Sequence, residues 1–283
     1  MLAASKVLLA ATLALAAAGK DWKPEYKTCR KLDFGNLTVI SQPPETERAW
    51  NVFAADLDGD GVDDVMSASL GDNTVGWYKS DGGSPPTFEK KIITDDAIGA
   101  YMVTAADMDD DGDLDVLSAS LGDSTIAWYM NDGDGGFMKY VISDEAFSAR
   151  SVAAGDLNGD GILDAASGSS ETTMGNETDG KLAWYKSDGG SPPTWETYVI
   201  ADPPGQRDVV IADLDGDGDM DIGGCSRLDN VVAFYENYDG EGNFIKHVAS
   251  NETLSAYGIT ACDLDLDGID DMIAASPQLH EVA

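Results

Sequence analysis

Basic residues are scarce in this chain. Of 283 residues, 17 are Lys or Arg and 52 are Asp or Glu, which gives a formal net charge of −35. Nucleic acids and anionic membrane surfaces are bound through basic patches. We therefore expect no nucleic-acid partner and no attachment to an anionic membrane.

Histidine and recognisable catalytic motifs are also nearly absent. The two histidines are His247, expected on an outer strand, and His280, near the C-terminal end. No Gly-x-Ser-x-Gly turn and no phosphate-binding glycine loop occurs. The sequence therefore predicts a protein that is not an enzyme.

The three cysteines, Cys29, Cys225 and Cys262, are odd in number and not clustered. Cysteines in this number and placement say little about the fold. Cys225 and Cys262 align with alanines of other repeats, so we expect both to fill small buried positions. Cys29 could pair with either of them, and the sequence leaves that open.

Long apolar runs are missing after the first 18 residues. Residues 7–18 form a short apolar stretch that follows Lys6 and ends in small residues, which predicts a signal peptide over 1–18 and a secreted or cell-surface protein. A buried N-terminal helix is the alternative. The stretch is too short to span a membrane, and no later one reaches about 18 residues.

Acidic loops are abundant instead. Five nine-residue loops begin at Asp56, Asp107, Asp156, Asp213 and Asp263, and they contain 24 of the 52 acidic residues. Oxygen-bearing side chains stand at loop positions 1, 3, 5 and 9, glycine stands at position 6, and position 7 can offer its carbonyl. Hard oxygen ligands at alternate positions around a tight turn are typical of calcium loops.

We therefore predict up to five structural Ca²⁺ ions, which would bring the formal charge to about −25. The third loop has asparagine at position 3 and is expected to bind most weakly. The predicted ligands are Asp56, Asp58, Asp60, Val62 and Asp64; Asp107, Asp109, Asp111, Asp113 and Asp115; Asp156, Asn158, Asp160, Ile162 and Asp164; Asp213, Asp215, Asp217, Asp219 and Asp221; and Asp263, Asp265, Asp267, Ile269 and Asp271.

The loops recur at intervals of 51, 49, 57 and 50 residues. Such a period indicates a repeat fold. Each unit holds four short β-branched and aromatic runs, with the loop between the first and second. The sequence predicts an all-β fold, a β-propeller of about five four-stranded antiparallel blades over residues 47–283. The long interval is explained by an insertion, Ser170–Gly180, between the second and third strands of the third repeat.

These loops and strand columns resemble the FG-GAP or VCBS-type calcium-loop propeller repeats, similar to those of the integrin α N-terminal propeller. The Asp-x-Asp-Gly-Asp-Gly-x-x-Asp pattern is matched in all five copies, apart from Asn158, Asp110 and Leu266. The Phe-Gly and Gly-Ala-Pro elements of the integrin version are absent. The resemblance implies a propeller and calcium, but not integrin partners.

Two other interpretations of the loops were weighed. An EF-hand needs glutamate at position 12, where this chain has only Ser, Gly or Ala. A plain acidic turn would explain one loop, but not five with acids in the same columns.

The last repeat stops before its aromatic third strand. Either residues 27–42, within the N-terminal segment 19–46, complete this blade, or the chain given is part of a longer protein. We expect an incompletely closed propeller of five units.

A second repeating column precedes each loop by six residues, and it should form a ring at the end of the innermost strands opposite the loops. Aromatic residues and arginines are common in binding hot spots, although packing between blades would explain the column equally well. We expect binding or adhesion to a protein or glycan; the alternative is a polysaccharide lyase or hydrolase, or its carbohydrate-binding domain. The ring residues are Trp50, Tyr101, Arg150, Arg207 and Tyr257.

Overall fold

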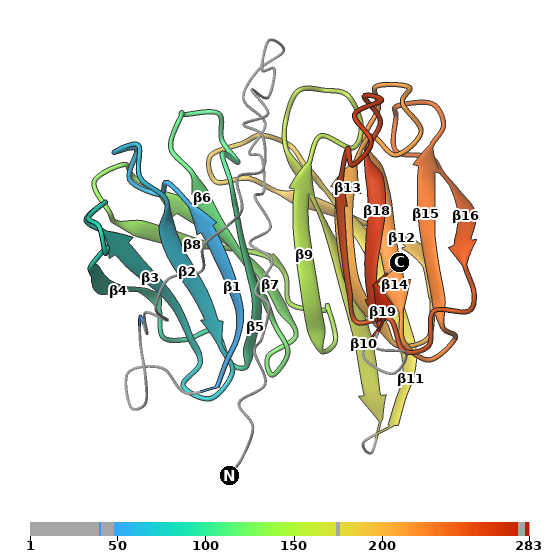
Figure 1. Ribbon diagram of the computed structural model, residues 1–283, viewed down its shortest axis with the longest axis horizontal. Helices are drawn as coiled ribbons and strands as arrows, with labels where there is room; N and C mark the ends of the chain where they lie inside the picture. The colour runs from blue at the N-terminus through green and yellow to red at the C-terminus, as the bar shows by residue number, and fades with distance from the viewer. Residues whose placement is uncertain (1–39, 41–47, 174–175, 277–280, 283) are drawn as a thin grey trace.

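The computed structural model describes residues 40, 48–173, 176–276 and 281–282. Within them the chain forms five antiparallel sheets of consecutive strands, four of four strands and a fifth of three. Figure 1 shows these sheets side by side, from the blue first sheet to the red fifth. The predicted β-propeller is confirmed, with its last blade incomplete among the described residues.

The strand bounds follow the predicted columns closely. Blade 1 consists of β1 (Ala49–Ala55), β2 (Asp64–Ser69), β3 (Thr74–Ser80) and β4 (Phe88–Thr94). Blade 2 consists of β5 (Ala100–Ala106), β6 (Asp115–Ser120), β7 (Thr125–Asn131) and β8 (Phe137–Ser143). Blade 3 consists of β9 (Ala149–Gly155), β10 (Asp164–Thr173), β11 (Asn176–Ser187) and β12 (Trp195–Ala201). Blade 4 consists of β13 (Gln206–Ala212), β14 (Asp221–Ser226), β15 (Val231–Asn237) and β16 (Phe244–Ser250). Blade 5 consists of β17 (Gly258–Cys262), β18 (Asp271–Ser276) and β19 (Glu281–Val282).

The insertion in the third repeat extends β10 and β11 rather than forming a separate loop. Their pairing continues through Ser170 and Gly180 to Thr173 and Asn176, with one irregularity at Glu171 and Thr172. The hairpin is therefore longer than its counterparts, and the strand register of the blade is unchanged.

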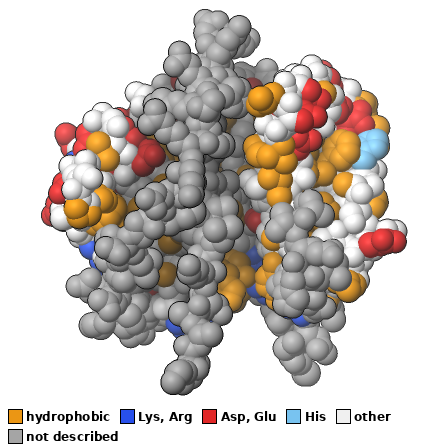
Figure 2. Space-filling model, viewed as in Figure 1, with side chains coloured by type: hydrophobic (Ala, Val, Ile, Leu, Met, Phe, Trp, Pro, Cys, Tyr) orange, Lys and Arg blue, Asp and Glu red, His pale blue; other side chains and the backbone are white. Residues whose placement is uncertain are grey.

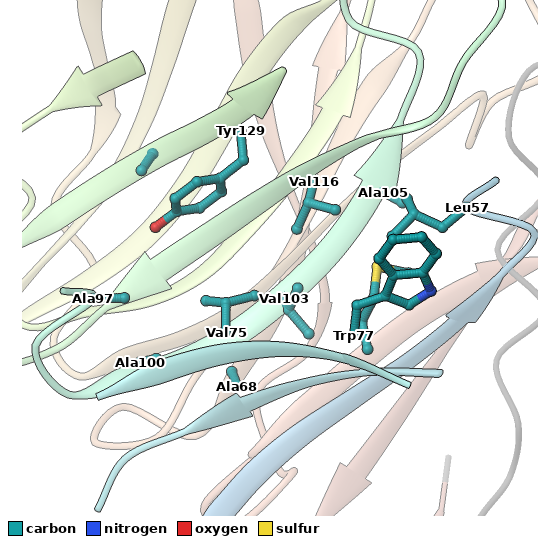
Figure 3. Close-up of a cluster of buried hydrophobic side chains, with 12 residues drawn as sticks. Leu57, Ala68, Val75, Trp77, Ala97, Ala100, Val103, Ala105, Val116 and Tyr129 are labelled. Atoms are coloured by element: carbon teal, nitrogen blue, oxygen red, sulfur yellow. The ribbon is translucent and has the colours of Figure 1, made fainter. Parts of the chain in front are cut away.

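The core lies between blades. The first strands of consecutive blades pack against one another, from β1 and β5 through to β13 and β17. At the first junction Trp77 and Val75 of blade 1 meet Val103 and Val116 of blade 2, as Figure 3 shows. Equivalent clusters fill the other three junctions. Burial between blades, rather than within one, therefore stabilises the fold.

Among the described residues, no further strand packs on the two outer faces of the series. The leading face of blade 1 exposes Val52 by 43%, whereas Val103, in the same column of blade 2, is fully buried. On the trailing face of blade 5, Leu264 is 62% exposed, whereas its counterpart Leu57 is 1% exposed. The predicted closure by residues 27–42 falls, except for Ile40, outside the described residues, as does the predicted signal peptide.

One predicted burial is wrong. Cys225 is buried as expected, but Cys262 is exposed, because it lies at the end of β17 in the open blade. The two thiols are not bonded to each other, and Cys29 lies outside the described residues.

The connections between third and fourth strands alternate. Blades 1 and 3 share the segment Lys-Ser-Asp-Gly-Gly-Ser-Pro-Pro-Thr, at 79–87 and 186–194. Blades 2 and 4 carry an asparagine where this segment has its first serine. The side-chain amides of Asn131 and Asn237 donate to the carbonyls of Leu57 and Leu157, both at 2.9 Å, and so link each even blade to the loop of the blade before it.

Candidate metal loops and the inner-strand rim

The first aspartate organises the backbone of every acidic loop. The amide of the glycine at position 6 donates to its carboxylate at 2.7–3.1 Å in all five copies. In four copies the amide of position 5 also donates to it, at 3.0–3.2 Å. The loops therefore share one conformation, as their shared sequence predicts.

The glycine at position 6 is required by the backbone and not by space. Gly61 has φ +86° and a Cβ added there would meet no atom within 4 Å. Position 4 is also left-handed, including the two residues that depart from glycine, Asp110 at φ +58° and Leu266 at φ +67°. A leucine in this conformation costs roughly 1–2 kcal/mol, so the fifth loop carries backbone strain.

The carboxylates converge as a divalent cation would require. In four loops, three groups place one ligand atom each within 4.8 Å of one another. In the first loop the buried Oδ1 of Asp58 has no hydrogen-bond partner in the structure. Hard oxygen donors at this spacing fit Ca²⁺. The groups are Asp56, Asp58 and Asp60; Asp107, Asp109 and Asp111; Asp213, Asp215 and Asp221; and Asp263, Asp265 and Asp271.

The third loop gathers no such group among the described residues. Its Asn158 has turned its side-chain amide nitrogen toward Asp164, at 2.9 Å. A nitrogen–hydrogen donor therefore lies where the other loops present an acceptor. That the third site is the weakest stays a prediction.

The aspartate at position 9 has a structural role that the pattern did not indicate. Asp64, Asp115, Asp164 and Asp221 are buried, and each accepts the amide at the end of the third strand at 2.7–2.8 Å. Burial raises the pKa of Asp115 to about 7 and that of Asp221 to about 6. Asp271, in the open fifth blade, is exposed. The buried members thus join the loop to two strands.

Position 7 was predicted to offer its carbonyl, and the structure shows what its amide does. In each loop this amide donates to the carboxylate of position 5, at 2.9–3.0 Å. The residues are Val62, Asp113, Ile162, Asp219 and Ile269.

The sequence interpretation missed three further side chains near the loops. Lys79, Lys186 and Glu236 stand directly after the aromatic pair of the third strand, which runs back to the loop end of each blade. Lys79 pairs with Asp58, and the Lys186 Nζ lies 3.5 Å from Asp160. The change of residue type directly after the Trp-Tyr column was the sequence signal that could have indicated these side chains.

At the other end of the inner strands, neighbouring members of the predicted ring stack on each other. We name Trp50, Tyr101, Arg150, Arg207 and Tyr257 the inner-strand rim. The Trp50 and Tyr101 rings lie 5.0 Å apart, and the Arg150 guanidinium lies 5.5 Å from the Tyr101 ring. The Arg207 guanidinium lies 4.7 Å from the Tyr257 ring. The rim thus contains two stacked groups, one of three residues and one of two.

The arginines of the inner-strand rim are buried, whereas its outermost aromatic rings are exposed. Arg150 and Arg207 are 7% and 5% exposed, whereas Trp50 and Tyr257 are 52% and 40% exposed. The aromatic faces, and not the guanidinium groups, are therefore available to a ligand.

Figure 2 shows acidic side chains gathered toward the upper end of the left and right blades, and the visible basic side chains in the lower half.

The one described histidine lies on an outer strand, as predicted. His247 of β16 places its Nε2 2.5 Å from Oε2 of Glu236. It lies on the fourth strand, and its ring stacks on Phe234 with centroids 4.8 Å apart. His280 lies outside the described residues.

Residues 56–118 and 107–167 match the FG-GAP-like repeat family, and they include the first three loops. The chain carries FG-GAP-like repeats. Comparison with curated proteins found no match. Among the described residues, no helix has the length and apolar character needed to cross a membrane.

Solved structures show the same fold. A lectin from Agrocybe aegerita, described as specifically recognising non-reducing terminal N-acetylglucosamine, is similar with a TM-score of 0.55 and 20% identity. The similarity covers 80% of this chain and 60% of the lectin, so this chain spans less than two thirds of that protein. At this identity the likeness concerns the fold.

Proposed function

We propose that this protein is a secreted, calcium-stabilised β-propeller that binds a glycan, in adhesion at a cell surface or matrix, and that it has no catalytic activity. The calcium part is supported by the converging carboxylates of four loops. The secretion part is supported by the predicted signal peptide over residues 1–18.

The observation that carries the binding proposal is the exposed Trp50–Tyr101 stack, with ring centroids 5.0 Å apart and Trp50 52% exposed. Aromatic faces present an apolar surface on which the C–H face of a sugar ring can lie. The buried Arg150 also contacts Tyr101, because a guanidinium 5.5 Å from the ring centre is within the range of a cation–π contact.

The rim lies at the start of β1 and the acidic loop at its end. Six residues separate Trp50 from Asp56, which in an extended strand is about 20 Å. The ligand would therefore bind away from the acidic end of the blades. A neutral glycan fits this surface, because the rim's charged groups are buried.

The test is binding of the calcium-loaded protein to a glycan array, followed by the double variant Trp50→Ala with Tyr101→Ala. Loss of the two rings should weaken binding about tenfold or more, since each stacked aromatic contributes roughly 1 kcal/mol. The control is Tyr238→Ala, which removes an equally exposed (52%) aromatic ring that follows β15 at the loop end. Unchanged glycan affinity in the rim variant would refute the proposed face, and capture of a protein instead of a glycan would change the ligand class.

A further inference from the structure

The acidic loops of blades 1 to 4 differ in the identity of one neighbouring side chain. The residue after the aromatic pair of the third strand is Lys79 in blade 1, Met130 in blade 2, Lys186 in blade 3 and Glu236 in blade 4. The following residue in each blade donates its amide to the ninth aspartate of the loop, at 2.7–2.8 Å. These four side chains therefore start from equivalent places beside their loops.

In blade 1 the lysine lies among the candidate ligands. The Nζ of Lys79 pairs with Asp58 Oδ2 and lies 3.6 Å from Asp60 Oδ2. Both carboxylates belong to the group of three that converges in this loop. An ammonium group is thus held by two of the carboxylates that a calcium ion would use.

Blade 3 repeats the arrangement. The Nζ of Lys186 lies 3.5 Å from Asp160 Oδ2, and Asn158 donates to Asp164 at 2.9 Å. In this loop the Lys186 ammonium therefore pairs with Asp160, and the Asn158 side-chain amide donates to Asp164.

Blades 2 and 4 lack this cation. Met130 carries no charge, and Glu236 adds a negative one. The carboxylates of these two loops therefore lack the lysine partner that Lys79 and Lys186 give to the first and third loops.

We propose that Lys79 and Lys186 act as internal counter-cations that lower the calcium affinity of the first and third loops and hold these blades folded when calcium is scarce. The second and fourth loops, without this ammonium, fill first. A lysine ammonium and a bound Ca²⁺ on the same carboxylates repel each other, so the lysine must be displaced as the ion binds and the calcium affinity of the loop is lower.

This inference rests on the calcium part of the proposed function. The experiment is hydrogen–deuterium exchange of the whole protein, with protection of each loop peptide followed as free Ca²⁺ is raised at constant ionic strength. The second and fourth loops should become protected at calcium concentrations about tenfold or more below those needed by the first and third.

Three variants assign the effect. Lys79→Met, which copies the residue of blade 2, should lower the calcium midpoint of the first loop about tenfold, and Met130→Lys should raise that of the second loop by a similar factor. The control is Lys139→Met, which removes a lysine paired with Asp96 at 2.9 Å outside any loop. It should leave all midpoints unchanged.

Equal midpoints in all loops of the wild-type protein, or Lys79→Met behaving like Lys139→Met, would overturn the role of the lysines while leaving the calcium proposal intact. If no loop responds to calcium, both are overturned. Glycan binding by the rim is measured separately and is independent of either result.

Discussion

At the scale of single residues, Asp208 joins two blades through the inner strands. Its Oδ2 accepts the amide of Ile259 in β17 at 3.0 Å, and its Oδ1 accepts the amide of Val209 at 3.0 Å. Burial raises the pKa of this carboxyl to about 6, against the hydrogen bonds that lower it. Between blades 1 and 2 an uncharged side chain makes the equivalent link, because Asn51 Oδ1 accepts the amide of Val103 at 3.1 Å.

Asp208→Asn should remove a pH-dependent part of the protein's stability. Because the folded-state pKa lies above the unfolded-state value, the native state binds the proton more tightly, and wild-type stability falls as pH rises from about 4 to about 6. The variant should lack this fall, although it also loses one of the two hydrogen bonds, because an amide nitrogen cannot accept from a backbone amide. Urea denaturation at several pH values measures it.

The exposed Asp95→Asn is the control for the change of charge. It should leave the pH dependence of stability as in the wild type. If Asp208→Asn shows the same pH dependence as the wild type, the buried carboxylate is not its source.

At the scale of the element, the surroundings of a strand depend on whether a blade precedes it. Four members of one inner-strand column, Val103, Val152, Val209 and Ile259, are 0–8% exposed, and the fifth, Val52, is 43% exposed. Four of these first strands have seven residues and β17 has five, and each of them pairs with the second strand of its own blade. The exposure of Val52 is therefore a property of its place in the series and not of its strand.

This column gives a matched comparison. Val103→Ala should lower the free energy of unfolding by about 1–3 kcal/mol, because it removes buried methyl groups and leaves a cavity. Val52→Ala, the same change in the same column, should cost less than about 0.5 kcal/mol. Chemical denaturation distinguishes them, and equal losses would show that the leading face of blade 1 is covered in solution.

The elements were largely predictable from the sequence, because each depends on local pattern. The alternation of β-branched and aromatic residues located β2 at Asp64 and β3 around Trp77, and the glycine columns located the loops. What neighbouring blades contribute was not predictable. The exposure of Cys262, the insertion of Lys79 into its loop and the burial of Arg150 all depend on side chains that lie in other strands or blades.

At the scale of the whole molecule, the distribution of negative charge dominates. The formal charge is −35, and nearly half of the acidic residues lie in the five loops. In all five blades the loop follows the first strand, so the loops share one end of the blades. Without calcium the carboxylates of each loop repel one another, and the loops with a lysine or an amide nitrogen are partly compensated.

Chelation should therefore lower the melting temperature substantially. Each site at 100 times its dissociation constant contributes roughly 2.7 kcal/mol to stability. Raising the salt concentration to about 0.5 M in chelator should recover part of the loss, because the repulsion between exposed carboxylates is screened. Differential scanning calorimetry on protein shown to be metal-free makes the measurement, and identical melting curves with and without calcium would contradict it.

The connections between the third and fourth strands also give the molecule a second period, longer than one blade. Residues 77–89 and 184–196 are identical at 12 of 13 positions, whereas the intervening second blade has a different connection. The connections therefore repeat with a period of two blades and not of one. Lys79 and Lys186 occupy the same place in this two-blade period, so loops with and without a neighbouring lysine alternate along the first four blades.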